Sequence, residues 1–261
     1  MAGVRKRTMT RVRMIPAYEI VQRTYPRPPR EQDEVAMAVG KAIDGALSSF
    51  SHEFRQGRKP TATAMRTLAE RLLDEGLEDA GVALPVVDRE KISKQLSGSL
   101  QAFRRSELFG LSRPRTRIVL IQNEVGVYAQ PDYWDGNSRF YEMKSYHAIP
   151  PPPDVELQLR LFQLAYPRFE SILFCIDRHS DPVETTSLVL PPPTEAEATR
   201  ALRLAYDLGR QFGQEKVLEY LEEPTLHYPI PVGSSDELGA PLVPARSTEG
   251  DGTPPSSGVV D

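Results

Sequence analysis

The order in which the hydrophobic periodicity changes along the chain is the feature that most constrains its fold. Apolar residues first recur at helical spacing in three stretches, at about 31–54, 63–79 and 88–104. From residue 117 the pattern changes to short β-branched runs, which predict strands at 117–121, 125–130 and 139–144. Helices first and neighbouring strands afterwards predict an α/β sandwich with a mixed sheet.

The second half of the chain carries signals for turns and helix ends. Asp135-Gly136-Asn137 predicts a tight turn between the second and third strands. Asp154 is a suitable N-cap for a helix, and two more strands are expected at 171–176 and 185–190. Thr194 and Glu197 predict a capping box for a last helix that reaches about Tyr220.

The two ends of the chain differ from its middle in charge and composition. Residues 1–30 contain eight Arg and Lys against one Glu, and we interpret them as a basic disordered arm that either contacts a polyanion or is simply solvated. Residues 229–261 are acidic and rich in Pro, Gly and Ser, which predicts a disordered tail. The folded domain is then 31–228, and we expect any protein partners to bind the two tails.

Several classes of protein are excluded by what the sequence lacks. It contains no apolar run long enough to span a membrane, no secretory leader, no phosphate-binding P-loop and no G-x-S-x-G nucleophile motif. Cys175 is its sole cysteine, so an internal disulfide, a zinc site made of cysteines and an iron–sulfur cluster are ruled out. We therefore expect a cytoplasmic (intracellular) protein with no membrane association.

Candidate chemistry lies on the hairpin around the predicted turn. Strand alternation places Glu142 and Lys144 on one face of their strand, and the turn brings Asp132 beside Glu142. Two carboxylates and an ammonium group then converge, which suits Mg²⁺ or Mn²⁺. A lysine beside such an ion can orient an attacking water while the ion stabilises charge on a phosphate.

Pro131-Asp132 and Glu142-Met143-Lys144 resemble the PD-(D/E)xK motif of nucleases. The surrounding residues, 126–132 and 141–146, are similar to the RecB-like branch of that superfamily, which includes CRISPR-associated exonucleases. Gln158-Leu-Arg-Leu-Phe162 resembles the QxxxY motif of that branch, and Gly40-Lys-Ala-Ile-Asp44 resembles its upstream GxxxH motif. The resemblance covers about residues 35–190.

This resemblance implies a restriction-endonuclease-like α/β/α sandwich with a central mixed sheet and an N-terminal helical insertion. It implies that Asp132, Glu142, the carbonyl of Met143 and Asp44 hold Mg²⁺ or Mn²⁺. Lys144 would position the attacking water, and Gln158 would orient Lys144 or a phosphate. The expected activity is exonuclease-like hydrolysis of DNA, as single strands or ends, in repair, recombination or defence.

Two positions depart from the family pattern. Asp44 replaces the metal-binding histidine, and it is either a ligand or a solvated residue of an amphipathic helix. Phe162 replaces the tyrosine and lacks its hydroxyl, for which Tyr166 is a candidate substitute.

Nearby side chains allow two interpretations each. Tyr133 and Trp134 either stack on unpaired bases or close the hairpin hydrophobically. Five arginines form either a phosphate-contacting patch or a solvated connector: Arg104, Arg105, Arg113, Arg115 and Arg117. For the whole chain, the alternatives to a nuclease are a nucleic-acid-binding subunit that does not cleave and an unrelated α/β scaffold protein.

Overall fold

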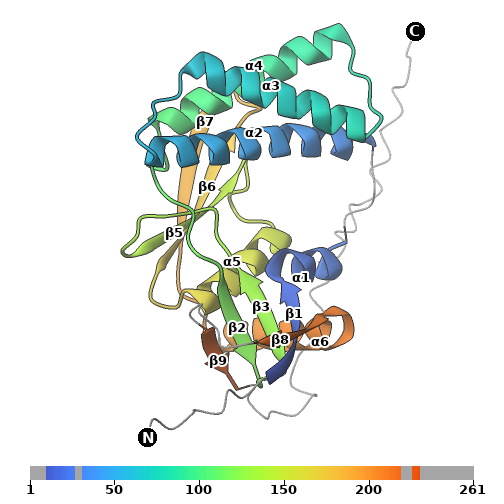
Figure 1. Cartoon of the computed structure of the whole chain (residues 1–261), viewed down its shortest axis with the longest axis vertical. Coiled ribbons are helices and arrows are strands. Elements are labelled where there is room, and N and C mark those ends of the chain that lie inside the picture. Colours follow the sequence, from blue (N-terminus) through green and yellow to red (C-terminus); the bar gives the residue numbers. More distant parts are fainter. Residues whose placement is uncertain (1–9, 27–30, 219–224, 230–261) are drawn as a thin grey trace, which may run out of the picture. The chain divides into compact units, whose positions relative to one another are not determined.

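A computed structural model describes residues 10–26, 31–218 and 225–229, and this part of the chain is a mixed α/β structure (Figure 1). The chain divides into two units, Met1–Ile230 and Pro231–Asp261, and every described residue belongs to the first. The predicted disorder of residues 1–9 and 230–261 lies outside the described residues. The elements are β1 (Thr10–Pro16), α1 (Ala17–Thr24), α2 (Glu31–Arg55), α3 (Ala62–Asp79), α4 (Val86–Arg105), β2 (Arg117–Ile121), β3 (Val125–Ala129), β4 (Tyr133–Trp134), β5 (Arg139–Lys144), α5 (Pro153–Ala165), β6 (Glu170–Asp177), β7 (Glu184–Leu190), α6 (Glu195–Phe212), β8 (Gln214–Leu218) and β9 (Thr225–Tyr228).

The described strands form two mixed sheets. One has five strands in the order β8-β1-β3-β2-β9, and the other has four in the order β4-β5-β6-β7. The α/β class is therefore confirmed, whereas the expectation of one central sheet is wrong. The chain passes from the first sheet to the second between β3 and β4, where Pro131 has no N–H group to continue a ladder.

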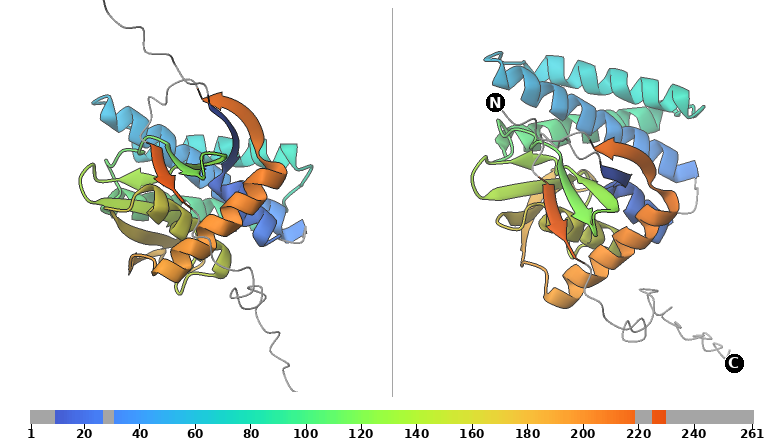
Figure 2. Two further views of the ribbon diagram at one scale, coloured as in Figure 1. Left: turned by 90° about the horizontal axis from the view of Figure 1, so that it is seen from below. Right: turned by 60° about the horizontal axis from the view of Figure 1, so that its bottom comes forward.

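The interpretation of residues 1–30 as a disordered arm is wrong for 10–24. β1 lies inside the five-stranded sheet, parallel to β3 and antiparallel to β8, which Figure 2 shows as a dark blue strand beside an orange one. Ile15 on β1 and Ile20 on α1 are fully buried. The sequence did contain a strand signal, because Val12 and Met14 are buried while Arg11 and Arg13 beside them are exposed. The folded unit therefore begins before residue 31.

The three helices predicted before the strands are confirmed as α2, α3 and α4, which pack on one face of the four-stranded sheet (Figure 1). Tyr141 and Met143 of β5 belong to the core beneath these helices. Phe140, which has the opposite parity on the strand, belongs to the core on the other face. Strand alternation therefore directs Glu142 and Lys144 away from the three helices and toward α5.

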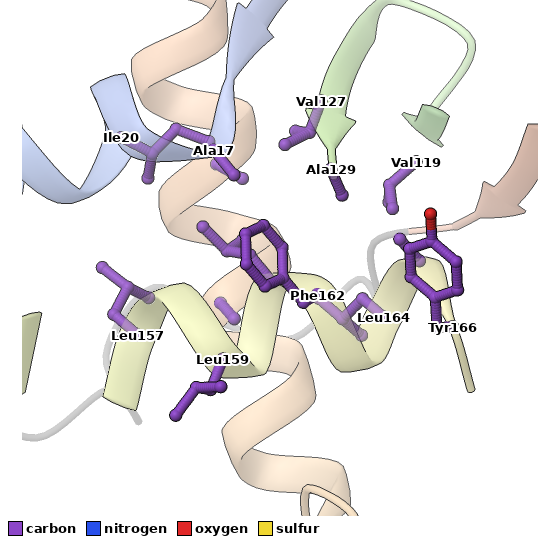
Figure 3. Close-up of a cluster of buried hydrophobic side chains, with 14 of the residues drawn as sticks. Ala17, Ile20, Val119, Val127, Ala129, Leu157, Leu159, Phe162, Leu164 and Tyr166 are labelled. Carbon is purple, nitrogen blue, oxygen red and sulfur yellow. The ribbon is translucent and has the colours of Figure 1, made fainter. Parts of the chain in front are cut away.

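A second core joins residues of both sheets to α1, α5 and α6. Figure 3 shows Leu157, Phe162 and Leu164 of α5 near Ala17 of α1 and Val127 of β3. Helix α5 begins at Pro153, with Pro152 at its N-cap and no side-chain cap, so the expectation of Asp154 as the N-cap is wrong by two residues. Proline at the first position suits this start, because its missing N–H group would have no helical partner.

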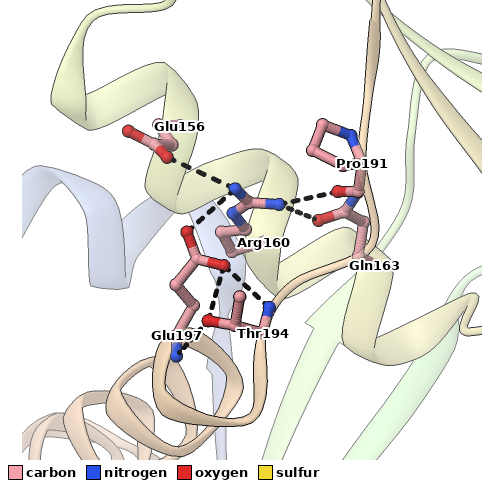
Figure 4. A network of polar contacts seen from close by, with 6 residues as sticks. All are labelled: Glu156, Arg160, Gln163, Pro191, Thr194 and Glu197. Carbon is pink, nitrogen blue, oxygen red and sulfur yellow. Dashed lines mark hydrogen bonds and ion pairs between the residues drawn. The ribbon is translucent and has the colours of Figure 1, made fainter.

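Helix α6 is tied to α5 through Arg160. The guanidinium of Arg160, on α5, contacts Glu156 of the same helix and Glu197 of α6, and it donates to the carbonyl of Pro191 (Figure 4). The predicted capping box of Thr194 and Glu197 is confirmed, with each side chain bonded to the other's backbone. The helix ends at Phe212 rather than near Tyr220, because residues 214–218 form β8 against β1.

None of the helices among the described residues is both long enough and apolar enough to cross a membrane.

Candidate functional site

The β4–β5 hairpin places the aspartate of the motif beside the strand that carries Glu142 and Lys144. One carboxylate oxygen of Asp135 accepts from three consecutive backbone N–H groups of the turn, at 2.8–3.0 Å, and Gly136 adopts the left-handed φ of 84° that the turn requires. Tyr133 pairs with Tyr141, and Oδ2 of Asp132 accepts from the N–H of Met143 at 2.9 Å. The predicted proximity of Asp132 to this strand is confirmed.

Lys144 joins Glu142 to α5. Its Nζ donates to Oε1 of Glu142 at 2.6 Å and to Oε1 of Gln158 at 3.0 Å. Glu142 and Lys144 therefore lie on the same face of β5, as predicted. Gln158 fixes the direction of the Lys144 ammonium group. The roles of these groups in catalysis stay predictions.

Burial and the close spacing of the charged groups in this cluster shift the pKa values of Glu142 and Lys144. Glu142 is only 3% exposed, and burial followed by the charge of Asp132 raises its pKa to about 8. Burial alone disfavours the Lys144 ammonium, but the charges of Glu142 and Asp132 outweigh it and raise the pKa of Lys144. Lys144 therefore stays protonated at neutral pH and acts as a charged donor.

Asp44 lies on α2 near the end of β5. A Cβ atom at Gly40, one helical turn earlier, would be 3.6 Å from Oγ of Ser145, the residue after Lys144. The Asp44 side chain keeps access to solvent, yet the protein on its other sides and the charge of Asp132 raise its pKa to about 7. This placement brings Asp44 into the field of Asp132 and Lys144, while its role as a ligand stays a prediction.

The oxygen donors present are of the type that Mg²⁺ and Mn²⁺ prefer, and their mutual repulsion would be relieved by a cation. In the described part of the chain, however, no three His, Cys, Asp or Glu side chains are grouped as a ready-made metal site. The carboxylates are instead held by the protein, Glu142 by Lys144 and Asp132 by the N–H of Met143. Met143 thus takes part through its N–H group, and a role for its carbonyl stays a prediction.

The structure adds two arginines to the site, neither of which was predicted there from the sequence. A guanidinium nitrogen of Arg113 lies 3.5 Å from Oδ1 of Asp132, and one of Arg178 donates to Oγ of Ser145 at 3.2 Å. Arg113 was expected only within a broad arginine patch. Arg178 follows the end of β6, which is parallel to β5, and only this strand pairing reveals its position.

Three side chains have structural roles in place of the nucleic-acid contacts considered for them. Tyr166 is 1% exposed and donates its hydroxyl to the carbonyl of Arg115, so it does not replace the missing tyrosine of the motif. Tyr133 is buried against Phe103, which supports the hydrophobic interpretation of the hairpin. Arg117 lies over the ring of Tyr166 and donates to a backbone carbonyl, so it is not part of a free phosphate patch.

A hollow of about 410 Å³ adjoins the site on the side of Gln158. Its walls come from the β1–α1 junction, β3 and α5, and include Tyr18, Tyr128 and Phe162. Gln158 therefore has Lys144 on one side and a partly aromatic hollow on the other.

Comparisons with known proteins add little to this description. No family model matches the chain, and no curated protein matches it. A solved structure described as "Crystal structure of SSO0001" is 11% identical, with a TM-score of 0.31 over 76% of this chain and 84% of that chain. A likeness of that size carries no argument about fold or function.

Proposed function

We propose that this protein is a metal-dependent nuclease that hydrolyses DNA phosphodiester bonds on a scaffold related to the PD-(D/E)xK sandwich. The observation that carries the proposal is a set of hydrogen bonds at the end of β5. Lys144 donates to both Glu142 and Gln158, and Asp132 accepts from the N–H of Met143, which lies between Glu142 and Lys144. These four residues match the motif in type and order, and they meet although they come from β5, α5 and the link before β4.

Each side chain has a distinct task in this proposal. Asp132 and Glu142, with Asp44 beside them, would hold Mg²⁺ or Mn²⁺, which supplies Lewis-acid activation of water and of the phosphate. Lys144 keeps its proton, so it donates a hydrogen bond to the attacking water or to a phosphate oxygen and stabilises negative charge there. Gln158 holds the Lys144 ammonium in one direction, which preserves the geometry that the reaction needs.

A second candidate is a nucleic-acid-binding subunit that does not cleave. It is favoured by the hydrogen bond from Lys144 that already occupies Glu142, together with the lack of a ready-made metal group among the described residues. Isothermal titration with Mn²⁺ separates the two candidates. A nuclease binds the ion and loses this binding in Asp132→Asn, whereas a subunit that does not cleave shows no heat of binding in either protein.

The direct test uses end-labelled single- and double-stranded DNA, with circular DNA as the control for free ends. Cleavage is expected with Mg²⁺ or Mn²⁺ and none with EDTA. Degradation of linear but not circular DNA would assign an exonuclease. Intact substrates under every condition would refute the proposed activity.

A further inference from the structure

A second hollow, of about 540 Å³, lies between α4 and the loop that joins β6 to β7. Its size is within the range of ligand-binding sites in proteins. Five of its lining residues decide its character: Lys91, Lys94, Arg178, His179 and Asp181. Cations outnumber the acidic group among them, so this groove favours an anionic occupant. We refer to it as the α4 groove.

Arg178 is the strongest feature of the α4 groove. The residue is only 7% exposed, and its hydrogen bonds go to Oγ of Ser145 and to the ring of His179, both uncharged acceptors. No carboxylate in the described part of the chain forms an ion pair with it. A buried charge without a counter-charge is costly, and an anion in the groove would offset that cost.

The outer wall of the α4 groove carries two more free cations. Lys91 and Lys94 are exposed, lie three residues apart on α4 and therefore share a face of the helix. Neither forms an ion pair within the described ranges, in contrast to Arg66, another lining residue of the groove, whose guanidinium is already paired with Glu70 at 2.8 Å. Gly98 lets α4 approach the loop closely, because a Cβ atom there would be 2.5 Å from a side-chain carbon of Val183.

The α4 groove connects to the candidate site through one contact. Arg178 donates to Ser145, and Ser145 follows Lys144 on the chain. Ser145 and Arg178 both follow the carboxyl ends of the paired parallel strands β5 and β6, so an anion bound by Arg178 would lie at the same edge of the sheet as Lys144, on the side of the helices.

We propose that the α4 groove binds the backbone of a single nucleic-acid strand that passes over the edge of the sheet from Lys144, with Arg178 receiving one phosphate and with Lys91 and Lys94 contacting the phosphates beyond it. The identity of the occupant rests on the proposed nuclease function. Repeated phosphates match a row of cations that begins beside the site and continues along α4.

The test measures the binding of a fluorescein-labelled oligothymidylate by anisotropy, in EDTA, over a series of salt concentrations. For single strands, each phosphate contact contributes about 0.7 to the slope of log K against log salt. Lys94→Glu and Arg178→Met should each weaken binding and lower this slope by about one contact. Lys59→Glu is the matched control, because it reverses the same charge at an exposed position of the α2–α3 loop that is not among the residues lining the groove.

Two outcomes would overturn the α4 groove as a binding site. One is wild-type affinity and slope in both groove variants, and the other is an equal loss in Lys59→Glu. Lys94 is exposed, so its variant tests the proposal even if Arg178→Met does not fold. Because no metal or cleavage is required, a protein that binds through the groove but never cleaves refutes only the nuclease. A protein that cleaves while the groove variants bind normally refutes only the groove.

Discussion

Lys144 is the side chain through which β5 and α5 meet at the candidate site, at 2.6 Å from Glu142 and 3.0 Å from Gln158. We expect Lys144→Ala to abolish cleavage while Mn²⁺ binding persists, because the proposed ligands are carboxylates and the ammonium acts on water and phosphate. Activity on labelled DNA and isothermal titration measure the two effects. Lys59→Ala is the control, and wild-type turnover in Lys144→Ala would remove Lys144 from the mechanism.

Substitutions at Asp44 decide whether this residue is a metal ligand or a solvated residue of α2. If it binds the ion, Asp44→Asn should lower Mg²⁺ affinity, because ligand charge tunes the binding of hard ions. Asp44→His should keep some activity and shift the preference toward Mn²⁺, which accepts imidazole more readily. The measurement is activity against metal concentration for the three proteins, and superimposable curves would exclude Asp44 from the site.

The residues of the site that could be predicted from the sequence are those whose spacing is local. Asp132, Glu142 and Lys144 belong to one hairpin, so strand alternation and a turn signal were enough to bring them together. Arg178 could not be found in this way, because its contact with Ser145 depends on the parallel pairing of β5 with β6 across an intervening helix.

At the scale of elements, α2–α4 could be predicted from local sequence patterns, whereas β1 was missed. The helices show their own 3.6-residue period over many residues, whereas the alternation in β1 is short and its partners β3 and β8 are more than a hundred residues away. The basic charge of residues 1–30 also suggested solvation, although Arg11 and Arg13 alternate with the buried Val12 and Met14. The strand β8 was missed for the same reason, as an extension of α6.

The place of β1 in the core leads to a stability prediction. Ile15→Ala should lower the free energy of unfolding by about 2–5 kcal/mol, because Ile15 is fully buried and the cavity cannot collapse completely. Arg11→Ala, on the same strand but exposed, is the matched control and should change it by less than about 0.5 kcal/mol. Denaturant unfolding measures both, and equal stabilities would mean that β1 contributes nothing to the fold.

At the scale of the whole molecule, the buried Glu142 should make stability depend on pH. Its pKa is about 8 in the folded protein and ordinarily 4.5, so between these values the folded state holds a proton that the unfolded state releases. Stability therefore falls as the pH rises through this window, by an amount on the order of a few kcal/mol.

Melting temperatures at pH 5 and pH 8 test this dependence. The decrease from pH 5 to pH 8 should be smaller in Glu142→Gln than in the wild type, by about 2–4 °C for each kcal/mol removed. Glu184→Gln, at an exposed position on β7, should behave like the wild type. Identical decreases in all three proteins would contradict the raised pKa of Glu142.

The division of the strands into two sheets has a consequence for the modularity of this protein. Glu142 and Lys144 belong to the four-stranded sheet, and Gln158 lies on the helix that follows it. Asp132 lies in the link that leaves the other sheet, and Asp44 comes from the helical layer. A segment transplanted from residues 133–190 would carry three of these side chains and leave both aspartates behind. The site is thus a property of the assembled unit, and recombination with another protein could exchange it only as a whole.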